Sequence, residues 1–188
     1  MELRGTRTYE NHGVEADLVV LAEEPDRRTE EESWTAAGTP IGQVRVFFDG
    51  ARGGQETSFG QDSTFGDEEN ERVRRKSVLH PMLDPARVYK DVTLRRTGRV
   101  GGEETYVLDL VTASGAAAVW HVSAATGRLL QTEADGETTT YGDYRDVDGE
   151  LVAFRTTTQE ALGEITVVAK QVRFNVDLPP AAFVPLHR

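Results

Sequence analysis

Four carboxylates gathered in one short stretch are the first residues whose types and spacing could do chemistry. They are Asp143, Asp146, Asp148 and Glu150, and such a cluster could ligate Ca²⁺ or supply an acid and a base. The spacing lacks the glutamate that an EF-hand loop carries at its twelfth position. Acid–base catalysis needs carboxylates in different environments, which an exposed turn does not provide. We therefore expect Asp148-Gly149 to form a hairpin turn, and catalysis by Asp143 and Asp146 is the weakest functional hypothesis.

Histidine, cysteine and glycine motifs give no further support for catalysis or metal binding. The chain has no cysteine, which excludes thiolate catalysis and disulfides. No two histidines have the spacing of a zinc site on a helix. The glycine-rich segments 50–54 and 98–102 lack the helix that a phosphate loop needs. We expect no metal and no cofactor, and we expect His121 to be an ordinary strand residue beside Trp120. The four histidines are His12, His80, His121 and His187.

The overall charge limits the partners that the chain can have. A net charge of −11 over 188 residues disfavours nucleic acid and anionic lipid surfaces, because both need a positive footprint. The run Glu30-Glu31-Glu32 is expected to be a solvated strand edge that resists edge-to-edge pairing. A local basic group contrasts with this acidity, and two explanations are open. The group either complements the charge of a helix end, or it contacts an acidic partner or a lipid headgroup. The group consists of Arg72, Arg74, Arg75 and Lys76.

The elements that must position these residues are mostly strands. Apolar and polar residues alternate with the period of a strand along most of the chain, and turn signals such as Asp49-Gly50 recur between the runs. We expect Asp49-Gly50 to form a type I′ turn, in which both residues take a positive φ. The expected strands are residues 14–21, 27–35, 41–48, 52–59, 89–96, 104–112, 116–122, 128–134, 138–144, 151–158 and 165–175.

One helix is expected, after residue 66. Asp67 is a suitable N-cap, acidic residues follow in the first turn and basic ones later, and Pro81 and Pro85 end the run. The uncharged span 110–127 is too polar for a membrane helix and is broken by Ser114-Gly115, so we expect no transmembrane segment. The sequence shows no export signal, and an exported protein would carry one outside it.

The order of these pieces resembles domains of the bacterial LolA/LolB-like lipoprotein-carrier superfamily. The resemblance is carried by Pro25-x-Arg27, by Phe47-Phe48-Asp49-Gly50, by the strand pair around Thr126-Gly127, and by Tyr144 to Gly149 followed by Asn175-x-x-Leu178-Pro179-x-x-x-Phe183-x-Pro185. It implies a mainly β fold for residues 1–188 as a single domain. The implied architecture is a half-open antiparallel barrel of about 10–11 strands with one or two short capping helices. We expect residues 175–185 to close the barrel.

The resemblance also implies an apolar interior that can hold acyl chains. Aromatic side chains on successive strands fill the core of a packed barrel and line the cavity of an open one, and the sequence leaves both alternatives open. The candidates to line the cavity are Trp34, Phe47, Tyr106, Trp120, Phe154 and Phe174.

Two non-enzymatic functions follow from the resemblance. The first is a periplasmic or otherwise extracytoplasmic binding domain that holds a lipid, a lipidated protein or another apolar ligand in a concave sheet. The second is a scaffold or interaction module of a larger extracytoplasmic protein, for example one appended to a peptidase, which meets a protein partner and holds no small ligand. The sequence also leaves a cytoplasmic location open. An open apolar cavity of roughly several hundred Å³ favours the first function, and a filled interior favours the second.

Overall fold

The computed structural model describes residues 1–79 and 81–186. Within these residues, thirteen strands form one antiparallel sheet in the order β6-β5-β4-β3-β2-β1-β13-β12-β11-β10-β9-β8-β7. The strands are β1 (Glu2–Tyr9), β2 (Val14–Glu23), β3 (Arg27–Ala36), β4 (Thr39–Phe48), β5 (Gly53–Thr57), β6 (Ser63–Thr64), β7 (Asp91–Val100), β8 (Glu103–Val111), β9 (Ala117–Ser123), β10 (Leu129–Ala134), β11 (Glu137–Val147), β12 (Glu150–Glu160) and β13 (Gly163–Arg173).

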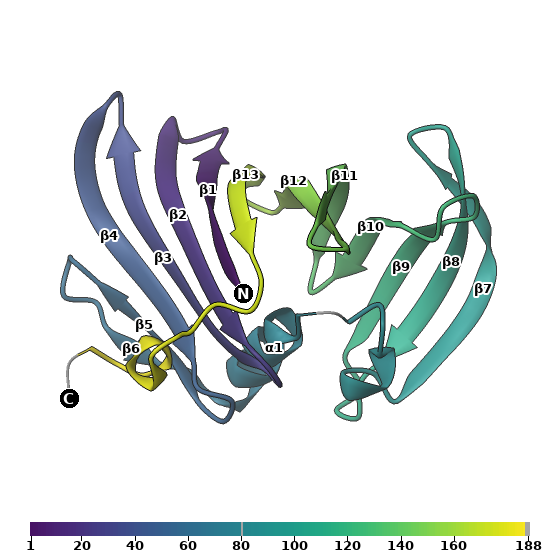
Figure 1. Cartoon of the computed structure of the whole chain (residues 1–188), viewed down its shortest axis with the longest axis horizontal. Coiled ribbons are helices and arrows are strands. Elements are labelled where there is room, and N and C mark those ends of the chain that lie inside the picture. Colours follow the sequence, from purple (N-terminus) through teal and green to yellow (C-terminus); the bar gives the residue numbers. More distant parts are fainter. Residues whose placement is uncertain (80, 187–188) are drawn as a thin grey trace.

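The sheet is curved and open, which confirms the predicted mainly β, half-open fold. Its two edges, β6 and β7, lie on opposite sides of the molecule (Figure 1). The strand count exceeds the prediction because β1 and the two-residue strand β6 were not expected. The alternate β1 residues Leu3, Gly5 and Arg7 do not make an apolar stripe, yet β1 pairs with both β2 and β13 and so joins the first strand of the chain to the last.

The turns follow the local sequence with one exception. Asp148-Gly149 forms the predicted hairpin turn between β11 and β12, with φ of 53° and 88°. The type I′ prediction at Asp49-Gly50 is wrong, because only the glycine takes a positive φ, of 100°. The Asp49 carboxylate instead accepts hydrogen bonds from the backbone N–H groups of Ala51 and Arg52, both at 2.8 Å, so the loop is longer than two residues.

The helix α1 (Asp67–Ser77) lies inside the curve of the sheet, between its two halves (Figure 1). Asp67 is the first helical residue rather than the predicted N-cap, a position that Gly66 occupies. Acidic residues fill the first turn and basic residues the last, as the helix dipole favours. Two short 3-10 helices, η1 (Pro85–Arg87) and η2 (Pro180–Phe183), complete the described elements.

Among the described residues, two clusters of apolar core residues lie in separate parts of the sheet. One lies between the segment that follows α1 and strands β8 and β9, and includes Val78, Tyr89, Leu110 and Trp120. The other is built on β12 and β13 from Phe154, Ala169 and Val172. The inner face between the clusters carries polar and charged side chains, and these form the site described below.

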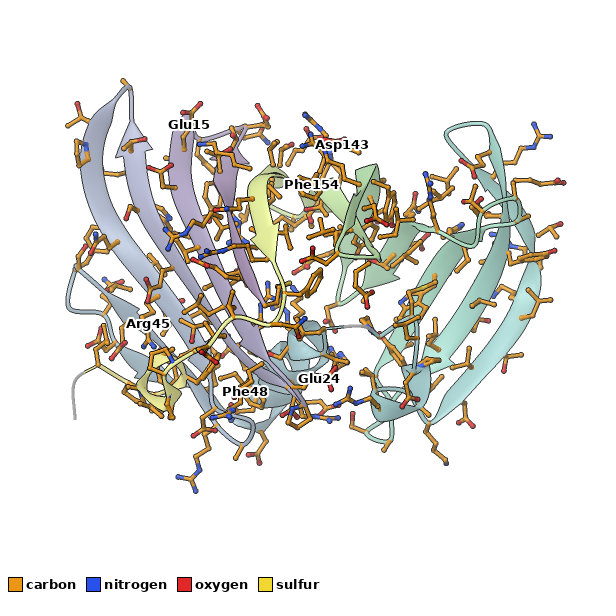
Figure 2. All side chains as sticks on the ribbon, in the orientation of Figure 1. Glu15, Glu24, Arg45, Phe48, Asp143 and Phe154 are labelled. Carbon is orange, nitrogen blue, oxygen red and sulfur yellow. The ribbon has the colours of Figure 1, made fainter. Side chains whose placement is uncertain are left out.

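The C-terminal segment does not close the sheet, contrary to the prediction for residues 175–185. It crosses the sheet over β1–β4 and ends beside β5 and β6 (Figure 1). The Ala182 carbonyl accepts hydrogen bonds from Thr29 Oγ1 and Arg45 Nη2, both at 2.6 Å, and Arg45 lies next to this segment in Figure 2. Thr29 and Arg45 alternate with Glu30 and Val46, which face α1, so the segment covers the outer face.

Candidate ligand-binding groove

A groove of three adjoining pockets runs along the concave face beneath α1. The charged pocket has a volume of about 360 Å³ and is lined from β1, β3, β4, β12, β13 and α1. The central pocket, of about 430 Å³, is lined from β3, from β9–β12 and by Arg75, Lys76, Val78, Leu79, Pro81 and Tyr89. The apolar pocket, of about 420 Å³, follows on the other side of Leu79 and Pro81, which line both it and the central pocket. Each volume is in the range that small-molecule sites occupy.

The charged pocket has an ion-pair network in its floor. Glu30 of β3 accepts hydrogen bonds from Arg7 Nη2 at 3.0 Å and from Arg28 Nη2 at 2.7 Å. Burial alone would raise the pKa of the Glu30 carboxyl, but the positive charges of Arg28 and Arg7 outweigh it and hold that pKa well below its ordinary value. The Arg7 guanidinium is desolvated, yet Glu30 and Glu32 raise its pKa. The network is therefore fully ionised at neutral pH.

A second layer of the same network holds Glu32 in place. Its carboxylate pairs with Arg7 and accepts hydrogen bonds from the Tyr9 hydroxyl at 2.6 Å and from Trp34 Nε1 at 2.7 Å. Burial, followed by the hydrogen bond to Glu32, raises the pKa of the Tyr9 hydroxyl. Glu32 is only 7% exposed, and satisfied partners of this kind are what allow a charge to stay buried.

A narrow boundary, here called the waist, separates the charged pocket from the central pocket. The α1 side chain Lys76 donates to Glu137 of β11 at 3.0 Å, and Arg72 pairs with the same carboxylate. The hydroxyl of Thr158 lies 2.9 Å from that of Thr139. The waist is defined by the residues that line both pockets: Arg28, Glu30, Lys76, Glu137, Thr156 and Thr158.

The central pocket combines aromatic walls with hydroxyl groups. Trp120 packs edge-on against Tyr89, with ring centroids 5.4 Å apart. Across the pocket, the Tyr141 hydroxyl lies 3.2 Å from Thr132 Oγ1. Burial raises the pKa of the Tyr141 hydroxyl, so this group is a neutral hydrogen-bonding partner at neutral pH.

The apolar pocket is the least polar part of the groove. Two large side chains at its rim are left in water, since Leu83 is 75% exposed and Leu151 47%. Tyr144 lies at one wall with its hydroxyl donating to the Leu129 carbonyl, and burial, followed by the nearby Tyr141, raises the pKa of Tyr144 to about 12. The apolar lining consists of Met1, Leu79, Met82, Leu83, Leu129, Leu151, Val152, Ala153 and Phe174.

Two of the six predicted cavity residues lie in this groove. Trp120 lines the central pocket and Phe174 the apolar pocket. Phe47 lies on the outer face, because it pairs with Thr29 on the face opposite to Glu30, and Phe154 is buried in the second core cluster. The roles of Trp120 and Phe174 in binding remain predictions.

The other two predicted residues lie at the margins of the concave face. Trp34 is half-buried and stacks against Tyr9, with ring centroids 5.9 Å apart. Tyr106 is on β8 and is 45% exposed. Neither side chain lines the three pockets as the described residues form them. The sequence could not separate these positions from the groove, because alternation shows which residues share a face and not how far each lies along it.

The prediction that Glu30-Glu31-Glu32 forms a solvated sheet edge is wrong. Strand β3 lies between β2 and β4 in the interior of the sheet. Glu30 lines the groove, and Glu32, two residues further along, lies on the same inner face. A signal was present in the sequence, since Arg28, Glu30, Glu32 and Trp34 are spaced by two residues and so share a face. Charged residues at such spacing usually mark the solvated face of a sheet, so this pattern indicated exposed side chains rather than an inner ion-pair network.

The acidic cluster and the described histidines act as structural groups. Asp143 pairs with Arg145 at 2.6 Å and Asp146 accepts from the Gly149 N–H at 3.1 Å, as a hairpin requires. His121 is buried on β9, with Nε2 3.1 Å from Glu133. His80 and His187, which were also considered for zinc-site spacing, lie outside the described residues. Within the described part of the chain, no cluster of His, Asp or Glu is arranged to hold a metal ion.

The basic group on α1 is tied to the sheet. Arg75 binds the Asp135 carboxylate through both oxygens at 2.8 Å, while Arg72 and Lys76 pair with Glu137. These contacts support charge complementarity as the reason for the group. None of the described helices has the length and apolar character needed to span a membrane.

Comparison with known proteins identifies the fold. No protein-family model and no curated protein sequence matches the chain, whereas 15 solved chains match its structure. A putative outer membrane lipoprotein-sorting protein domain from Vibrio parahaemolyticus is 12% identical, with a TM-score of 0.64 over 97% of this chain and 88% of that one.

Two further solved structures agree. A LolA superfamily protein from Nitrosomonas europaea is 16% identical, with a TM-score of 0.63 over 98% of this chain and 90% of that one. A DUF1329 family protein from Desulfovibrio piger is 11% identical, with a TM-score of 0.64 over 97% and 88%. Identities this low support a shared fold and no more. The protein therefore has a LolA-like fold, as its sequence pattern predicted.

Proposed function

We propose that this protein is a non-catalytic, extracytoplasmic binding domain that holds a lipid or another ligand with an apolar part in the groove. The observation that carries this proposal is the apolar pocket, whose cavity of about 420 Å³ stays open to water at Leu83 and Leu151. The extracytoplasmic location is supported by the fold and by the description of the Vibrio parahaemolyticus domain as a lipoprotein-sorting one.

The energetic reason lies in the exposed rim. Covering a leucine side chain with an apolar ligand removes its surface from water and contributes roughly 1.5–3 kcal/mol. Leu83 and Leu151 flank a cavity that apolar side chains such as Met82 and Phe174 line beside the charged Arg128 and Glu150. An acyl chain could thus gain binding energy from the apolar side chains at this end of the groove.

A matched pair of substitutions tests the proposal. Leu83 is 75% exposed at the rim, and Leu162 is 74% exposed in the turn between β12 and β13, which does not line the apolar pocket as described. Titrated with a fluorescent fatty acid, the Leu83→Asp variant is expected to bind about tenfold or more weakly, since one leucine contact is lost and a charge is introduced. Leu162→Asp is expected to bind like the unaltered protein.

The proposal fails if the unaltered protein binds neither the fluorescent fatty acid nor an apolar dye, and if native mass spectrometry finds no species bound to the purified protein. Equal weakening by Leu83→Asp and Leu162→Asp would place the ligand outside the apolar pocket. Circular dichroism spectra of both variants provide the folding control.

The second candidate is a scaffold or interaction module without a small ligand. The observation that favours it is the ion-paired inner half of the groove, where Arg28 pairs with Glu30, and Glu137 pairs with Arg72 and Lys76, without any ligand. A protein that binds no apolar probe, yet retains a macromolecular partner by size-exclusion chromatography, would support this candidate over the first.

A further inference from the structure

The groove changes character along its length, and its pockets are continuous. The apolar and central pockets share Leu79, Leu129 and Tyr141, and the central and charged pockets share the six residues of the waist. A ligand whose tail lies in the apolar pocket and continues through the central pocket therefore meets the waist next. An amphiphile matches this sequence of surfaces better than a wholly apolar molecule does.

The waist presents two ion pairs from opposite walls. Arg28 and Glu30 both come from β3 and meet at 2.7 Å, whereas Lys76 of α1 meets Glu137 of β11 at 3.0 Å. Water reaches both pairs, since 23% of the Arg28 side chain and 50% of the Lys76 side chain are exposed. These groups are therefore accessible to a ligand, and together they carry no net charge.

A headgroup with a single charge gains little in this setting, because each ion pair offers it one attractive and one repulsive charge. A headgroup with both signs can place its anion against the cations and its cation against the carboxylates. The hydroxyl groups of Thr156 and Thr158 add hydrogen-bonding partners between the two pairs. The rest of the charged pocket is balanced as well, since Arg7 and Arg72 line it together with Glu69 and Glu160, so it favours neither a purely anionic nor a purely cationic headgroup.

We propose that the waist binds the headgroup of a zwitterionic amphiphile whose tail lies in the apolar pocket. This inference rests on the proposed function, since it needs a ligand in the groove. It goes further by naming the chemical class of the ligand and the orientation of the ligand along the groove, with the headgroup at the waist and the tail in the apolar pocket.

Four detergents with the same dodecyl chain test the headgroup directly: dodecylphosphocholine, dodecyl maltoside, dodecyl sulfate and dodecyltrimethylammonium. Calorimetric titrations are run below each critical micelle concentration and at levels that leave the circular dichroism spectrum unchanged. We expect the phosphocholine to bind about tenfold more tightly than each of the other three, which is the size of effect that one charge-assisted contact gives.

Charge-changing variants test the waist itself. Lys76→Gln leaves the waist with an excess of carboxylate, so preference should shift toward dodecyltrimethylammonium by about tenfold. Glu137→Gln should shift preference toward dodecyl sulfate. Because Glu137 also tethers α1, Arg28→Gln on the opposite wall provides a second variant, and it should shift preference in the same direction as Lys76→Gln. The exposed Lys90, which does not line the groove as described, provides the control Lys90→Gln.

Two results would overturn the inference. If all four detergents bind equally, or if the waist variants change preference no more than Lys90→Gln does, the waist is not a headgroup site. In either case this inference falls, and binding that still weakens with Leu83→Asp, or binding of the fluorescent fatty acid when none of the four detergents binds, leaves the proposed function standing.

Discussion

At the scale of single residues, Glu30 is the side chain on which the inner face depends most. It accepts hydrogen bonds from two guanidinium groups that come from different strands, Arg7 of β1 and Arg28 of β3. An ionised carboxylate between two cations stabilises the fold, whereas an uncompensated guanidinium in the same place destabilises it. Removing the Glu30 charge should therefore lower the free energy of unfolding even though no apolar contact is lost.

We predict that Glu30→Gln lowers the free energy of unfolding by about 2 kcal/mol at pH 7, because Arg7 and Arg28 then lose a shared counter-ion. The folded state holds the pKa of Glu30 below its ordinary value of 4.5. Its stabilising effect is therefore complete above that value and is lost as the pH falls below it. Urea unfolding measures the difference in the free energy of unfolding between the unaltered protein and Glu30→Gln. This difference should be about 1 kcal/mol smaller at about pH 3.5 than at neutral pH.

Glu15→Gln is the matched control for this experiment. Glu15 is exposed at the start of β2 (Figure 2), and its replacement should change stability by less than about 0.5 kcal/mol. If Glu30→Gln and Glu15→Gln behave alike at both pH values, the ion-pair network does not contribute to stability in the way described.

At the scale of elements, the C-terminal segment holds the outer face of β3–β5. Phe183 of η2 is fully buried, and the guanidinium carbon of Arg27 lies 5.2 Å from the centre of its ring. The Ala182 carbonyl accepts from Thr29 and Arg45, and the Leu186 N–H donates to Glu56 at 2.7 Å. The segment therefore covers polar strand residues that would otherwise face water.

We predict that Phe183→Ala lowers the free energy of unfolding by about 3–4 kcal/mol, the usual cost of emptying a fully buried phenylalanine site. Val184→Ala, at a position that is 38% exposed, should cost less than about 1 kcal/mol. Chemical denaturation measures both. Because the segment lies on the outer face, folded Phe183→Ala should bind the fluorescent fatty acid with unchanged affinity, and a large loss of affinity would show that the outer face and the groove are coupled.

At the scale of the whole molecule, an open sheet leaves edge strands that could pair with other chains. Edge β6 is only two residues long, while β7 is ten residues long and largely exposed. Strand β7 carries Arg95, Arg96 and Arg99, and its register with β8 is interrupted between Leu94 and Arg96. Charges and bulges are the devices by which natural edge strands avoid self-association.

We predict that the double substitution Arg96→Val and Arg99→Val promotes self-association, because it removes two of the three arginines of the β7 edge and makes that edge more apolar. Sedimentation velocity should show a concentration-dependent increase in the sedimentation coefficient. The control is the same change of charge away from the edge, Arg52→Val with Arg155→Val, at two exposed positions in the β4–β5 loop and in β12. Equal association by both double variants would show that net charge, rather than the β7 edge, is responsible.

The sequence by itself determined most of the strands, most of the turns and the fold class. Alternation with a period of two and glycine at positions of positive φ are local properties, so a segment such as Asp148-Gly149 specifies its own conformation. The order of these local pieces was enough to indicate a LolA-like fold. The sequence also placed an aromatic residue at two points of the groove, Trp120 and Phe174.

Only the tertiary structure decided which side chains meet. Lys76 and Glu137 are 61 positions apart in the sequence, and Arg7 and Glu30 are 23 apart, so no local pattern could pair them. Charge alone predicted that the glutamates of β3 face water, whereas partners on β1 and β3, such as Arg7 and Arg28, stabilise Glu30 on the inner face. The reason is physical: a strand is specified by its own residues, but the free energy of a charge depends on the neighbours that the fold brings to it.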